Sequence, residues 1–114
     1  MEAILNKITG AILAYEELPD KLVFEDKQTI NGLMKNLSSN LFYLEKYRDQ
    51  YARKFNSILH SHIKEGMAVS KAEIIAKEQV PEIYFLRRIM TSAYKALDSM
   101  RSNQSALKRE EDNG

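Results

Sequence analysis

The longest continuous feature of the sequence is a pattern of mostly apolar positions, from Ile30 to His62, whose spacing alternates between four and three residues. The positions are Ile30, Met34, Leu37, Leu41, Leu44, Arg48, Tyr51, Phe55, Ile58 and His62. A mean spacing of about 3.5 residues puts them on one stripe of a helix, the seam along which a coiled-coil helix packs against a partner. No proline interrupts the stretch, and a helix over it is about 50 Å long. A rod of this length predicts that the remainder of the chain is elongated too.

A second seam follows nearer the C-terminus, at Ile83, Leu86, Met90, Ala93, Leu97, Met100, Gln104 and Leu107. Gly66 is expected to end the first long helix, and the capping box Ser70-Lys71-Ala72-Glu73 to begin the next. The turn between them is short, which predicts that the second helix returns antiparallel to the first. Pro81 lies about three turns into this second helix, where the helix either kinks or gives way to a new one.

A short amphipathic helix over residues 2–17 is predicted by apolar residues at helical spacing near the N-terminus, from Ile4 to Tyr15. It ends before Pro19, because the residue preceding a proline is pushed out of the helical conformation. We therefore predict an all-α fold in a single domain, 1–114. It contains the short helix (2–17), a long helix (26–64) and a kinked long helix (70–109), and the two long helices form an antiparallel, coiled-coil-like hairpin.

Apolar residues beside the two seams predict self-association. A hairpin buries one stripe of each helix, and the short N-terminal helix covers only part of what remains. The residues expected at an oligomer interface are Phe42, Leu59, Phe85, Ile89 and Tyr94. Two hairpins that share these surfaces would complete a helical bundle, so we expect a homo-oligomer, most simply a dimer.

Composition narrows the class of protein. The formal net charge is +1, which gives no global field to attract nucleic acid or membranes. The chain contains no cysteine, which excludes disulfides and thiolate chemistry. Polar residues interrupt the apolar N-terminal stretch, so we expect neither a signal peptide nor a membrane span, and a cytoplasmic location.

Metal and catalytic sites are not predicted. His60 and His62 are two residues apart, so on a helix they point away from each other and cannot chelate one ion. There is no glycine-rich phosphate loop and no nucleophile, base and acid arrangement. We expect no enzyme activity, no cofactor and no small-molecule substrate.

Tyrosines interleaved with basic residues raise the alternative of nucleic-acid binding, since tyrosines stack on bases while Lys and Arg hold phosphates. The candidate residues are Tyr43, Tyr47, Arg53, Lys54, Arg87, Arg88, Lys95 and Arg101. The competing interpretation is a solvated helix face with mixed charges and packed tyrosines. Arg48 interrupts the first seam, where it either sets the register of packing or extends to solvent.

The region from Ser70 onward resembles small phage-encoded helical proteins of replication and recombination regions. The resemblance is carried by Ala72, Ala76, Pro81-Glu82-Ile83-Tyr84, Leu97-Asp98-Ser99-Met100-Arg101-Ser102 and Ser105-Ala106-Leu107-Lys108-Arg109-Glu110. It covers about the last 40 residues and implies a virus-associated accessory protein in the host-cell cytoplasm, acting on DNA or on a DNA-processing partner.

Two hypotheses of function follow. The first is a non-catalytic phage-type accessory protein of DNA recombination or replication that binds single-stranded DNA or a DNA-processing protein through its helix faces. The alternative is a protein–protein interaction module, such as a small inhibitor or adaptor, with no nucleic-acid binding. The interleaved aromatic and basic residues favour the first, and the near-neutral net charge favours the second.

Overall fold

Helices make up nearly all of the computed structural model, which describes residues 1–113, with side chains described as far as Arg109; Gly114, the end of the expected domain, lies outside the described residues. The helices are α1 (Glu2–Glu16), α2 (Asp26–Lys64), α3 (Val69–Gln79) and α4 (Glu82–Asn113). Residues 1–113 contain no strand. The predicted all-α hairpin is therefore confirmed, and the bounds of α2 are those predicted.

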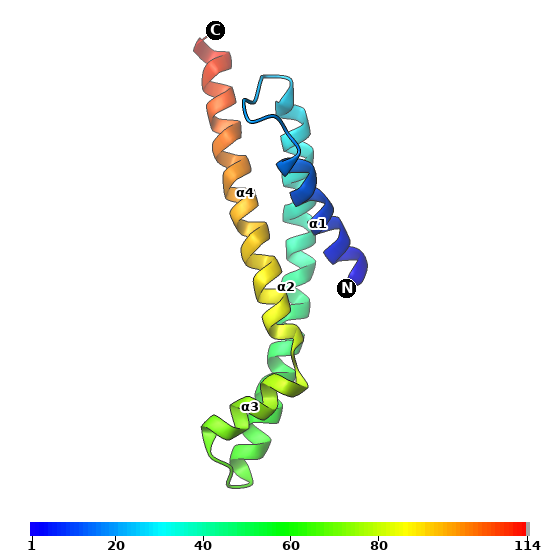
Figure 1. The fold of residues 1–114 in the computed structure, drawn as a ribbon, viewed down its shortest axis with the longest axis vertical. Helices are drawn as coiled ribbons and strands as arrows, with labels where there is room; N and C mark the ends of the chain where they lie inside the picture. The colour runs from blue at the N-terminus through cyan, green and yellow to red at the C-terminus, as the bar shows by residue number, and fades with distance from the viewer. Residues whose placement is uncertain (114) are drawn as a thin grey trace.

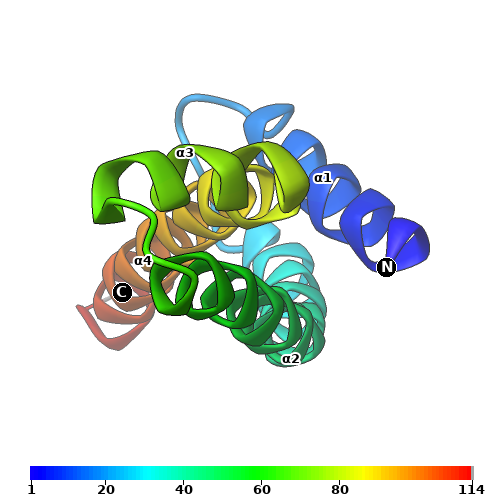
Figure 2. The same cartoon turned by 90° about the horizontal axis from the view of Figure 1, so that it is seen from below.

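The two long helices lie antiparallel, and the two short helices cover different parts of α2 (Figure 1). α1 packs along the N-terminal half of α2, whereas α3 folds back against its C-terminal end. Seen along the rod, α1 and α3 lie on the same side of α2 (Figure 2). The molecule measures 68 × 25 × 20 Å and its radius of gyration is 19.4 Å, against about 13 Å for a compact domain of this length.

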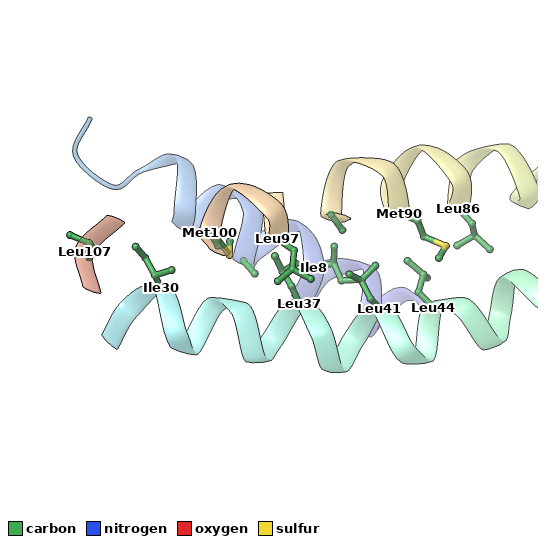
Figure 3. Close-up of a cluster of buried hydrophobic side chains, with 12 residues drawn as sticks. Ile8, Ile30, Leu37, Leu41, Leu44, Leu86, Met90, Leu97, Met100 and Leu107 are labelled. Atoms are coloured by element: carbon green, nitrogen blue, oxygen red, sulfur yellow. The ribbon is translucent and has the colours of Figure 1, made fainter. Parts of the chain in front are cut away.

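The buried core contains the first predicted seam as far as Leu44 and the second predicted seam from Leu86 (Figure 3). The buried side chains of α2 are Ile30, Leu37, Leu41 and Leu44, and those of α4 include Leu86, Met90, Ala93, Leu97, Met100 and Leu107. α1 adds Ile8 and Ala11. Neighbouring positions in these sets are three, four or seven residues apart, so one stripe of each helix faces the shared interior.

The turn between α2 and α3 is a Schellman motif around Gly66, whose φ is +96°. The amide of Gly66 donates to the carbonyl of Ile63 at 3.0 Å, and that of Met67 to the carbonyl of His62 at 3.0 Å. This conformation favours glycine, because a Cβ destabilises left-handed backbone. The predicted capping box does not form: α3 begins at Val69 after Ala68, with no side-chain cap, and Ser70 lies inside the helix.

The second long helix, predicted over 70–109 with either a kink or a new helix at Pro81, is broken there into α3 and α4. α3 ends at Gln79, and Val80 leaves the helical conformation with φ −130° and ψ 64°, as expected for a residue before proline. The carbonyl of Pro81 then accepts from the amide of Tyr84 at 3.2 Å, which starts α4. The break lets α3 turn back onto α2 while α4 continues along the hairpin.

Candidate binding surfaces

The residues predicted to contact nucleic acid on α2 differ in how far they are exposed. Tyr47 is partly buried and packs against the core cluster. Tyr43 is 49% exposed, and its ring meets Phe42 edge-to-face with ring centroids 5.7 Å apart. Arg53 and Lys54 are exposed two to three turns further along the helix. Tyr43 is therefore exposed to solvent, whereas Tyr47 packs as a core residue does.

On α4 the predicted basic residues divide between two sides of the helix. Arg87 lines a hollow between α4 and α2, whereas Arg88 lines a groove between α4 and α1. Lys95 is exposed. Arg101 is also exposed, and its Nη1 lies 3.5 Å from Oδ1 of Asp98. Consecutive residues on a helix point about 100° apart, which is why the pair of arginines separates.

The hollow between α2 and α4, which we name the arginine groove, has a volume of about 450 Å³. It is lined by Arg48, Ile83, Arg87, Met90, Thr91 and Tyr94. Arg48 comes from the first seam, but its side chain is exposed rather than buried. Among the described side chains, neither Arg48 nor Arg87 has a carboxylate ion-pair partner. Two guanidinium groups from distant parts of the sequence thus border one hollow.

Glu45 is the acidic residue next to this groove. The hydroxyl of Tyr94 donates a hydrogen bond to Glu45 Oε1. That hydrogen bond, together with partial burial and the negative charge of Glu45, raises the pKa of Tyr94 above its ordinary value of 10.0, while Arg48 acts in the opposite direction. Tyr94 is therefore neutral at physiological pH, and the side chains that line the groove carry two positive charges, those of Arg48 and Arg87.

Three basic side chains and one tyrosine form a row that extends from the arginine groove along α4, and we name it the basic row. Arg87, Tyr94, Arg101 and Lys108 follow one another at intervals of seven residues, which is close to two helical turns, so they share one side of α4. All four are exposed. Successive members are about 10 Å apart along the helix axis, giving an extended strip in which an aromatic hydroxyl is flanked by cations.

The groove between α1 and α4, which we name the apolar groove, has a volume of about 460 Å³. Its walls are Thr9, Ile12, Leu13 and Glu16 on α1, and Phe85, Arg88, Ile89 and Ser92 on α4. Leu13 is 51% and Phe85 is 46% exposed. Each wall has the spacing i, i+3, i+4, i+7, which is the stripe that a helix presents to a packing partner.

Two of the five predicted interface residues, Phe85 and Ile89, lie together in the apolar groove. Tyr94 lies in the arginine groove, Phe42 is exposed on α2, and Leu59 is partly buried. Leu13 and Glu16 were missed from the sequence, although the stripe Thr9, Ile12, Leu13, Glu16 is visible there. The sequence predicts α1 only as a cover for the hairpin, and this stripe forms a second, outward-facing side of the helix.

The histidines do not converge on a metal. His60 is exposed, and His62 Nδ1 is 3.9 Å from Glu65 Oε2, too far for a hydrogen bond. Across the described part of the chain, no three His, Asp or Glu residues are grouped so as to hold a metal ion. A search of the same residues finds no helix with the length and hydropathy needed to span a membrane.

Comparisons of the chain with protein-family models, curated proteins and solved structures find no match. Function is therefore inferred from the two grooves themselves.

Proposed function

We propose that this protein is a non-catalytic accessory protein that binds single-stranded DNA, with the arginine groove and the basic row of α4 as its phosphate-binding surface. The observation that carries the proposal is the pairing of Arg48 with Arg87 across one hollow without a carboxylate partner. Guanidinium groups bind phosphate oxygens through paired N–H donors. The resemblance of the C-terminal region to phage replication and recombination proteins agrees with this function and stays a prediction.

The shape of the surface favours a single strand over a duplex. The basic row on α4 spans Arg87 to Lys108, about 31 Å along the helix axis. Within residues 1–113, no helix stands clear of the rod to enter a major groove (Figure 1). Tyr94 lies between two cations of the row, where its ring offers a face for base stacking. Phosphate contacts from such a strip are independent of sequence, so we expect little base preference.

The test measures binding of a fluorescently labelled oligothymidine by anisotropy over a range of salt concentrations. We expect the affinity of the wild type to fall steeply with salt, because each neutralised phosphate releases condensed counterions. Replacing Arg48 and Arg87 together with alanine should weaken binding and reduce the salt slope by about 1.4, at about 0.7 per lost phosphate contact.

The matched control is the double replacement Arg53→Ala with Lys54→Ala, which removes the same charge from α2 outside the arginine groove. Sequence alone predicted these two residues as phosphate contacts; the groove geometry predicts that their removal leaves affinity and slope nearly unchanged. If the two double variants weaken oligothymidine binding equally, the attraction depends on the total positive charge and not on the arginine groove. Absence of binding by the wild type at low salt would exclude the proposed function.

A protein-interaction module is the second candidate, and the apolar groove favours it. Leu13 and Phe85 line the same hollow, and each exposes about half of its surface. Single exposed apolar side chains are common on protein surfaces, whereas a group of them in one hollow indicates a binding surface. If oligothymidine does not bind, an adaptor that uses this groove becomes the preferred function.

A further inference from the structure

The apolar groove has walls of two different helices that together form a self-complementary surface. α1 contributes Leu13 and Glu16, and α4 contributes Phe85 and Arg88. One wall therefore carries an acid and the other a base, and each also carries a large exposed apolar side chain. From these residues we propose that the groove is the interface of a homodimer, in which α1 of each protomer lies on α4 of the other. This proposal is independent of DNA binding.

The order of residues along the two walls of the groove determines which residues can meet in the proposed dimer. α1 and α4 run in the same direction along the rod (Figure 1). The hydroxyl of Tyr15 lies 2.7 Å from Ser99 Oγ, so the C-terminal end of α1 is at the Ser92 end of the groove. Glu16 is therefore near that end on one wall, and Arg88 lies toward the Phe85 end on the opposite wall.

A two-fold axis that lies in the plane of the interface, perpendicular to the diagonal from the Glu16 corner of the groove to its Phe85 and Arg88 corner, sets two grooves face to face and exchanges these corners. Glu16 of one protomer is then carried to the Arg88 end of its partner's α4, and Leu13 to the partner's Phe85 and Ile89. The same operation repeats both contacts, as an isologous interface requires. The apolar side chains meet in the centre, and the charged pair lies at each edge, which is the usual arrangement of an interface core and rim.

A second copy of the chain fits this surface better than a partner of one charge. The rim holds Glu16 and Arg88 with opposite signs, so a strongly acidic or basic partner would meet repulsion at one end. α1 contains 15 residues and is about 22 Å long, which limits the contact to the small end of specific interfaces, so we expect a dissociation constant in the micromolar range.

The arginine groove remains open in such a dimer. Arg87 faces α2 whereas Arg88 faces α1, so the proposed interface and the proposed phosphate-binding surface lie on different sides of α4. The dimer would display two arginine grooves, and two linked sites bind one strand more tightly than either alone.

The first experiment measures molar mass by sedimentation equilibrium from about 5 to about 200 µM, a range that brackets a micromolar dissociation constant. We expect the wild type to pass from monomer to dimer. Leu13→Asp should remain a monomer with an unchanged melting temperature, because Leu13 is already 51% exposed in the protomer. The matched control, Ile74→Asp, makes the same kind of replacement at an apolar residue of α3 that is 56% exposed and lies outside the groove, and it should dimerise as the wild type does.

The second experiment uses two single charge reversals. Glu16→Arg alone and Arg88→Glu alone should each weaken the dimer by about tenfold, since two like-charged contacts replace two attractive ones. An equimolar mixture of the two variants should restore dimerisation, because both contacts in the mixed dimer then pair opposite charges. A contact between Glu16 and Arg88 within one protomer cannot produce this recovery.

Three outcomes would overturn the proposal. A wild type that stays monomeric throughout the concentration range has no such interface, whatever else occupies the groove. A dimer that persists in Leu13→Asp uses another surface. Single reversals that weaken the dimer without recovery on mixing would contradict the two-fold arrangement. None of these outcomes bears on oligothymidine binding by the monomer, so the two proposals fail separately.

Discussion

The two halves of α2 share one seam but differ in how deeply they are buried. In the N-terminal half, where α1 and α4 both contact α2, Ile30, Leu37 and Leu44 are 0% exposed. Beyond Arg48 the seam continues through Tyr51, Phe55 and Ile58, yet none of these is fully buried. There α3, a helix of 11 residues, is the main cover.

The difference shows that the period of a seam determines which side of a helix is covered, but not how completely. α3 contributes Ala72 and Ala76 as its fully buried residues on its packing face. Small side chains let two helices approach closely but bury little apolar area. The three-helix half of the molecule should therefore hold most of the stability, and the α2–α3 end should open more readily.

The largest expected effect comes from truncating the same seam in its two halves. Leu37→Ala should lower the free energy of unfolding by about 2–5 kcal/mol, because it leaves a cavity in a fully buried position. Ile58→Ala, in the two-helix half, should cost about 1 kcal/mol, since the side chain is only partly removed from water. Urea unfolding at a concentration where the protein is monomeric measures both. Equal losses would contradict the difference between the two halves.

A smaller effect is expected at the turn that closes the two-helix end. Gly66→Ala should destabilise the protein by about 1–2 kcal/mol, because alanine is strained in left-handed backbone. A Cβ at Gly66 meets nothing within 4 Å, so crowding adds no cost. Gly32→Ala is the matched control: its Cβ is equally free, but its position inside α2 predicts a gain of about 0.5–1 kcal/mol. Thermal melting of both variants should show shifts of opposite sign.

The smallest effect concerns the contact of Tyr94 with Glu45, near the junction of the two halves. The hydrogen bond to Glu45 raises the pKa of Tyr94 above 10.0, so the unfolded chain releases this proton at lower pH than the folded chain does. The resulting stability is fully present below pH 10.0 and is lost as pH rises through the folded-state pKa. Tyr94→Phe should remove the part of the loss of stability at alkaline pH that comes from ionisation of Tyr94. Spectroscopic titration of tyrosinate beside alkaline unfolding tests it, and identical profiles would argue against the contact.

The helices were predictable because their signals are local. The seams from Ile30 and from Ile83, and the glycine stop at Gly66, each depend on a few neighbouring residues. Pro81 was recognised as a disturbance, but a kink and a break differ only in whether the preceding segment finds a surface to pack on. Here α3 packs on α2, and that contact lies outside the reach of a local pattern.

The candidate sites were less predictable for the same reason. Arg87 and Arg88 are adjacent in the sequence and were grouped together, yet they line different grooves. Tyr47 was predicted to be available for stacking but packs against the core. Whether a residue beside a seam is buried depends on which helix packs against it and on the position of that helix along the rod. Helical spacing in the sequence gives no information on either.

Local patterns in the sequence were enough to predict that the chain is helical, where its long seams run and where the first long helix stops, because hydrophobic periodicity and glycine conformation act over one or two turns. The packing of the helices was needed to find that Arg48 and Arg87 line one hollow, and that Leu13 and Phe85 line another. These pairs are separated by tens of residues, and only the packing of α1, α2 and α4 against a common core brings them within reach of one another.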